Sequence, residues 1–353
     1  MKLKVLSLLV LSSVGQFSEA SVTSASLFKE MQSTNPAVIS GRTARALSFL
    51  AKKDSIEISQ DLSTGPLGAG SKFDAEVELT NYSGFYGGKG GGPTLEIFAE
   101  TGSGGRTNKI KEGSTVSENM TESTLTNLSV GMGLFEGFGL GLTKIAAEDK
   151  QQYNFTVNSQ PVNVNTTFEY DLTALTAGIS FNLGLDFGLF YRKGSLESKS
   201  ATQADTKQGI DRVGAGVGLV SKVFRAEVGY VKDLNSIDSS IGKLSPTMME
   251  FTVEGALGKL KLGYTGRYYQ DGFFLLRGVL YNNLAFQTNN EDRLENTFNF
   301  AYGNDSKGHS ISGAVSIGTV DSQEAQPFIA NDTTKYKTTT KTQSFSLSYA
   351  YIF

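Results

Sequence analysis

The chain alternates large apolar residues with small or polar ones along most of its length. In the last segment Ser344, Ser346, Ser348 and Ala350 share one face. The opposite face carries five large side chains: Phe345, Leu347, Tyr349, Tyr351 and Phe353. A period of two predicts a β-strand, because successive side chains of a strand point to opposite faces. The pattern recurs near residues 73–79, 128–134, 213–219, 224–230, 260–268, 298–302 and 311–317.

These segments have the length and character of membrane-crossing strands. Several extend for about 9–11 residues, which a tilted strand needs to span a bilayer. One apolar face opposite a small, polar face fits a wall with lipid outside and water inside. Residues 21–353 contain no apolar stretch of about 18 residues, as a membrane helix would require. The sequence therefore predicts an all-β fold, a transmembrane antiparallel β-barrel.

The links between the segments indicate how the barrel is oriented. Short links at Glu136-Gly137, Ser221-Lys222 and residues 304–308 alternate with longer polar segments. The longer segments lie near residues 102–122, 147–165, 196–208, 233–245 and 321–340. Short turns on one rim and long loops on the other are typical of outer-membrane barrels. The raw count is about 15 strands and the true number must be even, so we expect about 14, with 16 as the alternative.

The N-terminal region predicts export followed by a plug. Residues 1–20 have the form of a signal peptide, with Lys2 and Lys4 before an apolar stretch and Ser18-Glu19-Ala20 at the cleavage position. Residues 21–53 are expected to fold into the lumen as a plug, because residues 37–50 are too apolar to remain solvated. A disordered periplasmic tail is the alternative. The barrel itself is then expected to comprise residues 54–353.

Composition narrows the chemistry. The chain has no Cys, which excludes thiol chemistry, and a single His, His309, beside a predicted short periplasmic turn. One His disfavours His-rich metal sites and His-based acid–base catalysis, so we expect no enzyme, no cofactor and no metal. The formal net charge of −3 argues against a nucleic-acid partner.

The alternation also assigns charged side chains to the lumen. The acidic candidates come from the early strands: Glu57, Asp61, Asp74, Glu76 and Glu78. The basic candidates come from later in the chain: Arg212, Arg225, Lys259, Lys261, Arg267 and Arg277. Opposed charged walls orient polar solutes, and an inward cation can hold a carboxylate head group. The alternative is that these charges pair with one another and simply solvate a wet interior.

Two motifs carry a family resemblance. The strand that ends at Phe353 resembles the assembly signal of bacterial outer-membrane proteins, which implies recognition by the barrel-assembly machinery. Asn35-Pro36-Ala37, followed by small residues and a first strand containing Ile56 and Ile58, resembles the hatch of the FadL long-chain fatty-acid transporter family. Residues 276–281 and 292–303 are similar to that family's C-terminal strands. Val38 departs from the pattern, because the family usually has a glycine after the motif.

The FadL resemblance implies a plugged barrel in the outer membrane of a Gram-negative bacterium. Such a barrel passes hydrophobic small molecules, for example long-chain fatty acids, by passive diffusion. The expected partners are outer-membrane lipid and a hydrophobic ligand. The glycine-rich segment Gly87–Gly92 would then form a lateral opening, with a flexible turn as the alternative. Two other functions stay open: a general diffusion porin for small polar solutes, and a structural or adhesive barrel whose extracellular loops bind a partner.

Overall fold

The computed structural model describes most of the chain beyond residue 44. The described residues are Pro36, 45–64, 69–88, 94–112, 115–157, 160–200, 205–221, 223–235, 237–239, 242–244, 247–270, 293–303, 307–324 and 336–353. The predictions for the signal peptide and for most of residues 21–44 therefore lie outside the described residues. Within the described ranges, no helix is long and apolar enough to cross a bilayer.

Fourteen antiparallel strands close into one barrel, which confirms the predicted fold class and strand number. The first half of the wall contains β1 (Ala46–Asp61), β2 (Lys72–Gly88), β3 (Thr94–Glu112), β4 (Thr115–Phe135), β5 (Phe138–Val157), β6 (Gln160–Asn182) and β7 (Asp186–Ser200). The second half contains β8 (Thr206–Val220), β9 (Phe224–Asp233), β12 (Thr247–Leu257), β13 (Leu260–Gln270), β14 (Arg293–Gly303), β15 (Gly308–Glu324) and β16 (Tyr336–Ile352). β1 pairs with both β2 and β16, which closes the sheet, and β8 and β15 extend beyond the ends of their shorter neighbours β9 and β14.

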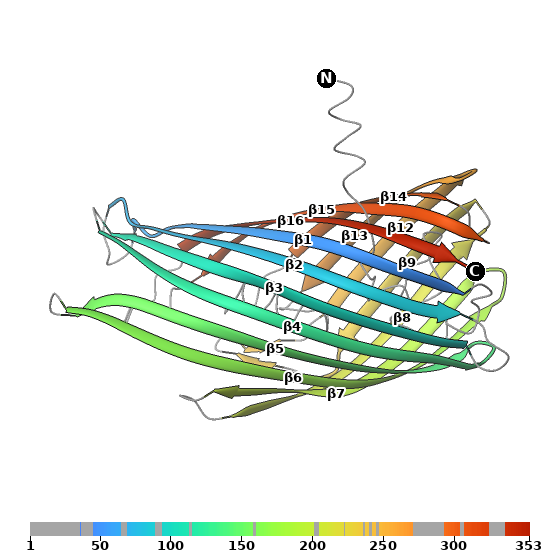
Figure 1. Cartoon of the computed structure of the whole chain (residues 1–353), viewed down its shortest axis with the longest axis horizontal. Helices are drawn as coiled ribbons and strands as arrows, with labels where there is room; N and C mark the ends of the chain where they lie inside the picture. The colour runs from blue at the N-terminus through green and yellow to red at the C-terminus, as the bar shows by residue number, and fades with distance from the viewer. Residues whose placement is uncertain are drawn as a thin grey trace, which may run out of the picture.

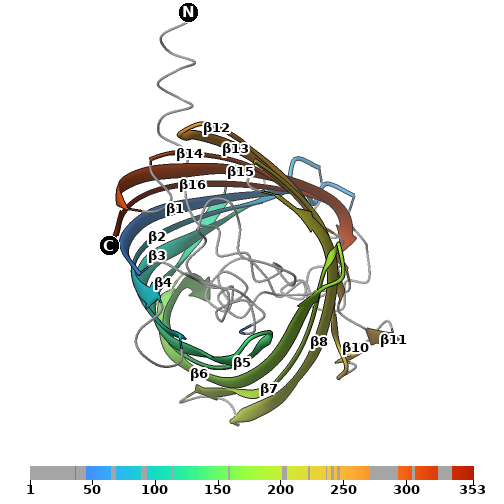
Figure 2. The ribbon, with the colours of Figure 1, turned by 90° about the vertical axis from the view of Figure 1, so that its right-hand side faces the viewer.

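A small hairpin lies outside the barrel sheet. It consists of β10 (Ile237–Ser239) and β11 (Gly242–Leu244) and is inserted between β9 and β12 (Figure 2). β9 and β12 still pair directly with each other, so the insertion leaves the wall continuous.

Short turns and the C-terminus share one rim of the barrel, seen at the right of Figure 1. Glu136-Gly137 and Gly258-Lys259 form two of these turns, and Gly137 and Gly258 both have positive φ, which suits glycine. The turn predicted at Glu136-Gly137 is thus confirmed. β12 ends at Leu257, before the turn, and β13 runs from Leu260 to Gln270.

Most residues of three predicted loops, 102–122, 147–165 and 196–208, instead belong to the ends of long strands. The first loop is divided between β3 and β4, the second between β5 and β6, and the third between β7 and β8. The polar composition of these segments is explained by water on the outer face, while the cross-strand ladder continues unbroken. The first strand also begins at Ala46, which corrects the expected start of the barrel at residue 54.

The wall is taller on one side than on the other. The four strands β3 to β6 contain 19, 21, 20 and 23 residues. The strands β9, β12, β13 and β14 contain only 10 or 11 each. We call the side formed by β16 and β1 to β8 the tall wall, and the side formed by β9, β12, β13 and β14 the short wall. In Figure 1 the tall wall extends far beyond the short one at the end opposite the C-terminus.

We take the rim with the short turns as the bottom of the barrel. The outer face of the tall wall is apolar near this rim and polar farther up. The apolar band, here called the lipid belt, includes Phe49, Tyr82, Tyr86, Ile97, Leu128, Met132, Leu140, Leu142, Leu175, Ile179, Phe181 and Leu189. Higher up, the outward positions of the same strands carry Glu57, Glu76, Thr124, Lys150 and Asp171. A membrane barrel needs this contrast, because lipid covers only part of its height.

A charge in the lipid belt is expected to destabilise the barrel. Ile179 is 42% exposed on the outer face of β6, and Ile179→Arg should cost about 2–4 kcal/mol because the guanidinium enters hydrocarbon. Glu76→Arg on the polar upper face of β2 is the control and should leave stability nearly unchanged. The measurement is urea unfolding of the barrel in lipid vesicles. Equal losses for the two variants would contradict the assignment of the belt.

Candidate functional site

The inside of the tall wall carries a continuous apolar surface above the level of the lipid belt. We call it the upper chamber. Its buried residues are Ile56, Ile58, Leu62, Phe73, Ala75, Val77, Leu79, Leu125, Ile145, Ala147, Leu172, Ala174, Ile210 and Tyr336. They come from β1, β2, β4, β5, β6, β8 and β16, together with the residue that follows β1. Tyr170 and Leu196 pack against this cluster from β6 and β7.

The upper chamber forms because, partway up each of these strands, the apolar side chains change from the outer face to the inner face. On β2, Phe73, Val77 and Leu79 point inward, whereas Tyr82 and Tyr86 point outward. The side chains still alternate, so most apolar positions change from odd to even numbers along the strand, and Phe85 is the exception that stays inward. This change of phase is visible in the sequence, and it is the signal that could have located the chamber.

The acidic lumen candidates were assigned to the wrong face. Glu57, Asp61, Asp74, Glu76 and Glu78 alternate with the inward Ile56, Ile58, Phe73, Ala75 and Val77 and therefore point outward. The prediction assumed that apolar side chains face lipid along the whole strand, and this part of the wall stands in water. Lys53 and Lys72 form exposed ion pairs there with Glu78 and Asp74, both with N–O distances of 2.8 Å.

Most of the basic candidates for the lumen point into the barrel. Arg212, Arg225, Lys261 and Arg267 are buried on inward positions of β8, β9 and β13. Lys259 is exposed in the short turn after β12, and Arg277 lies outside the described residues. Because four of the six candidates converge on the lumen, the prediction of a basic inner surface holds for these four.

Three arginines form buried ion pairs along this inner surface, which we call the ion-pair wall. Arg212 donates from Nε and Nη2 to the two carboxylate oxygens of Asp233, at 2.6 and 3.0 Å. Arg225 donates to Glu227, and its Nη1 lies 3.3 Å from Oε1 of Glu254.

The third arginine bridges two neighbouring strands. Arg267 donates from Nε to Glu250 at 2.6 Å and from Nη1 to Glu295 at 3.2 Å. Of the two alternatives that the sequence left open for these three arginines, the structure has the one in which each pairs with carboxylates of the lumen. Paired in this way, they fix the inner face of the short wall rather than offer unpaired charge, since removing one partner of a buried pair is strongly destabilising.

The lower lumen of the tall wall is also polar. Inward positions at the level of the lipid belt carry buried Glu96, Glu100, Asn127, Thr143 and Thr176. Asn127 donates to Glu100 at 3.2 Å, and Ser129 bonds to Thr143 at 3.2 Å. At the level of the membrane the inner face is thus mainly polar, with one apolar cluster of Leu50, Phe85 and Phe98, and it becomes more apolar above that level.

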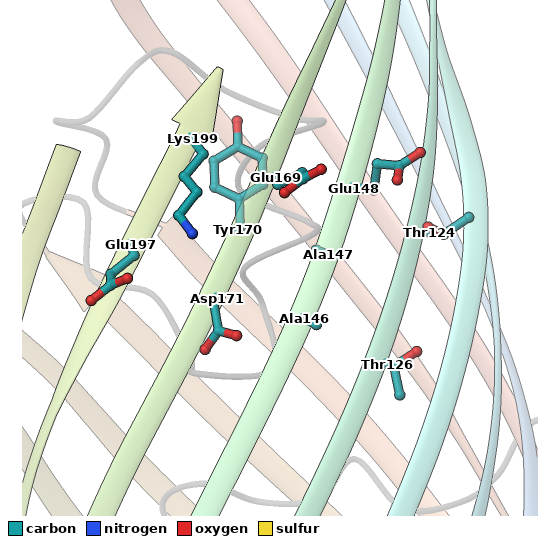
Figure 3. Close-up of a pocket in the computed structure, with 10 residues that line it drawn as sticks. All are labelled: Thr124, Thr126, Ala146, Ala147, Glu148, Glu169, Tyr170, Asp171, Glu197 and Lys199. Atoms are coloured by element: carbon teal, nitrogen blue, oxygen red, sulfur yellow. The ribbon is translucent and has the colours of Figure 1, made fainter. Parts of the chain in front are cut away.

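A groove of about 310 Å³ crosses β4 to β7 on the outer side of the wall (Figure 3). Glu148, Glu169, Asp171 and Glu197 line it, together with Lys199. Three of these carboxylates already pair with lysines, at 2.9 Å for Lys150–Glu148, 3.5 Å for Lys144–Asp171 and 2.5 Å for Lys207–Glu197. The groove is thus a water-facing, ion-paired surface outside the lumen.

Of the predicted plug motif, Pro36 is described, and Asn35 and Ala37 lie outside the described residues. Pro36 is buried. Its Cβ lies 3.8 Å from the position that a Cβ on Gly141 would occupy. Gly141 alternates with the outward Leu140 and Leu142 on β5, so this contact lies on the lumen side.

The glycine-rich segment is described only at its start. Gly87 and Gly88 complete β2 and pair with Glu96 and Leu95 of β3. Residues 89–92 lie outside the described ranges, so the lateral opening stays a prediction. At these two glycines the wall is continuous.

The C-terminal strand presents its large side chains outward, as the alternation predicts. Phe345, Leu347, Tyr349 and Phe353 are exposed on β16 or directly after it. His309 is the second residue of β15 and lies on the same outer face, where its Nδ1 bonds to the hydroxyl of Tyr349 and its ring lies 5.0 Å from that of Tyr351. Recognition of this strand by the assembly machinery stays a prediction.

Comparison with known proteins identifies the fold. No protein-family model and no curated protein matches the sequence. Among solved structures, the P. putida toluene transporter TodX aligns with a TM-score of 0.57 at 11% identity, covering 97% of this chain and 99% of that one. A Pseudomonas aeruginosa FadL homologue aligns with a TM-score of 0.58 at 12% identity, covering 92% and 93%. The fold resembles that of the FadL family.

A third structure supports the same assignment. The monoaromatic hydrocarbon channel CymD aligns with a TM-score of 0.52 at 10% identity, covering 90% of this chain and 91% of that one. At such low identity the likeness establishes the architecture, and side-chain roles have to be argued from this chain's own residues.

A disulfide can test the contact between Pro36 and the wall. The Cβ separation of 3.8 Å matches that of a natural disulfide, and the chain has no other cysteine. We expect Pro36→Cys with Gly141→Cys to form an intramolecular bond during export, seen as a mobility difference between reduced and non-reduced gels. Pro36→Cys with Gly184→Cys, in the turn after β6, is the control and should stay reduced. Bonding in both pairs, or in neither, would contradict the contact.

Proposed function

We propose that this protein is an outer-membrane channel that admits hydrophobic small molecules by passive diffusion. The observation that carries the proposal is the upper chamber, an apolar inner surface above the lipid belt. A barrel wall standing in water has no structural need for such a surface, because small polar residues would fill the same positions. An apolar solute gains about 25 cal/mol for each Å² of its surface that such a chamber removes from water.

The likeness to TodX, CymD and a FadL homologue supports the same class of function. TodX is a toluene transporter and CymD a monoaromatic hydrocarbon channel, so small aromatic hydrocarbons are reasonable first substrates to test. Long-chain fatty acids belong to the same proposed class. We further propose export through the signal peptide of residues 1–20 and residence in the outer membrane.

The proposal includes a plug formed by residues that precede β1. Pro36 is buried against the lumen side of Gly141, which supports a position for this segment inside the barrel. A plugged lumen excludes hydrated ions, whereas an apolar solute can reach the upper chamber from outside. A general porin for polar solutes would instead have an open, polar lumen throughout.

Substitution in the upper chamber should reduce hydrocarbon uptake. Leu172 is fully buried on the inner face of β6, and its neighbour Thr173 is exposed on the outer face. We expect Leu172→Asn to lower toluene uptake several-fold, because an amide makes the chamber polar, and Thr173→Asn to behave as wild type. The measurement is the initial uptake rate in cells above the empty-vector rate. Unchanged uptake in Leu172→Asn would contradict a role for the chamber.

Removing the proposed plug should open the lumen. Deletion of residues 21–44 leaves β1 complete, since that strand begins at Ala46. We expect the deleted protein to gain stable ion conductance in planar bilayers, while the intact protein conducts little. An intact protein that already conducts, with no change after the deletion, would favour an open porin. Heat-modifiable migration on gels would check that the deleted barrel is folded.

A further inference from the structure

Asp149 on β5 is a buried carboxylate on the inner face of the upper barrel, among neutral polar and apolar side chains. Its relative exposure is 0%. Ser123 donates from Oγ to Oδ1 of Asp149 at 2.5 Å, and Oδ2 has no hydrogen-bond partner within the described part of the chain. The carboxylates of the ion-pair wall each have an arginine, so the two sides of the lumen differ in this respect. A buried carboxylate oxygen left without a donor is costly, and this suggests a partner supplied from outside the protein.

Among the described residues, the inward neighbours of Asp149 on β4, β5 and β6 are uncharged. Its register partners are Ser123 on β4 and Phe168 on β6. Phe168 stacks with Tyr170, with ring centroids 6.5 Å apart and planes 18° apart. The remaining inward neighbours on the three strands are Thr121, Leu125, Ala147, Gln151 and Thr166. The nearby charged residues Glu122, Glu148 and Lys150 alternate with these and point outward.

Asp149 lies beyond the membrane-spanning part of β5. The lipid belt on that strand ends at Leu142, and the outward positions that follow are Lys144, Ala146 and Glu148. Burial raises the pKa of Asp149 to about 6, and the hydrogen bond from Ser123 acts in the opposite direction. The raised pKa means that the folded protein binds a proton here more tightly than the unfolded chain. At pH 7.5 the carboxyl is still mostly ionised and accepts hydrogen bonds.

We propose that Asp149 anchors the polar head of the solute in the upper chamber, and that this barrel prefers apolar molecules with one hydrogen-bond donor, such as phenols or alcohols. This inference rests on the proposed function and names its substrate class. A phenol can place its ring against the apolar and aromatic side chains and donate its O–H to Oδ2. A hydrocarbon leaves Oδ2 without a partner. A carboxylate solute would bring a second anion to a buried anion, which is unfavourable, so this inference narrows the proposed substrate class and leaves ionised long-chain fatty acids outside it.

The test compares three solutes of nearly equal size: toluene, 4-methylphenol and 4-methylbenzoate. Their uptake is measured at pH 7.5 in cells that express the full-length protein, as half-saturation constants above the empty-vector background. For the wild type we expect a lower constant for 4-methylphenol than for toluene, and no saturable uptake of 4-methylbenzoate. Asp149→Leu should weaken the preference for 4-methylphenol over toluene by about tenfold, the factor for one hydrogen bond to a charged group.

Two further variants complete the design. Asp149→Asn keeps the size and an acceptor oxygen but removes the charge, so it should lose only part of the preference and should admit 4-methylbenzoate. Asp171→Leu is the matched control, because Asp171 is a carboxylate on the outer face of the adjacent β6. It should retain the wild-type preference. Gel mobility before and after heating verifies the fold of each variant.

The outcomes separate the inference from the function on which it rests. If toluene uptake persists and both Asp149 variants keep the wild-type preference, the anchoring role is wrong and the channel function stands. If the wild-type protein takes up none of the three solutes above background, the proposed function is wrong and the inference falls with it. A loss of preference in Asp149→Leu with retained toluene uptake supports both.

Discussion

The medium that meets the outer face of the barrel changes from lipid to water along its height, and the rest of the structure follows from this constraint. Where the ladder is closed, it satisfies the backbone donors and acceptors, so only the side chains need to respond to the change. At the lipid belt, Leu140 and Leu142 point outward and Thr143 inward; above it, Lys144 points outward and Ile145 inward. The same period-two strand thus presents opposite chemistry to the lumen in its two halves.

Periodicity in the sequence is sufficient to predict the barrel, its strand number and several turns, because all of these depend on local alternation. Which face points inward is a separate question. The acidic candidates such as Glu76 were misplaced because one rule, apolar toward lipid, was applied to the whole length of β2. A shift of the apolar positions from odd to even numbers, between Leu79 and Tyr82, marks where that strand leaves the membrane. On β6 the corresponding shift, from even to odd numbers, occurs between Leu172 and Leu175.

The inner charges were predictable as residues but not as pairs. Arg225 and Arg267 alternate with apolar residues at membrane level, so their inward direction follows from the sequence. Their partners Glu254 and Glu295 are 29 and 28 residues away, and they are brought near only by the strand order and register. Asp149 could not be placed in the lumen from the sequence. It lies in the polar segment 147–165, which the sequence predicts as a loop, since nothing local indicates that β5 continues beyond the lipid.

The two halves of the lumen together constrain how an apolar solute can leave the upper chamber. Under the proposed function, a solute that moves straight down meets Glu96, Glu100 and the ion-pair wall, whose groups would lose favourable polar contacts. The cluster of Leu50, Phe85 and Phe98 offers apolar contact on one side of that path. A solute that moves sideways reaches the lipid belt, where its surface stays in an apolar medium, so the lateral path stays the prediction that these energetics favour. Gly87 and Gly88 are paired with Glu96 and Leu95 of β3, so an opening at these two glycines would require the hydrogen bonds between β2 and β3 to break there.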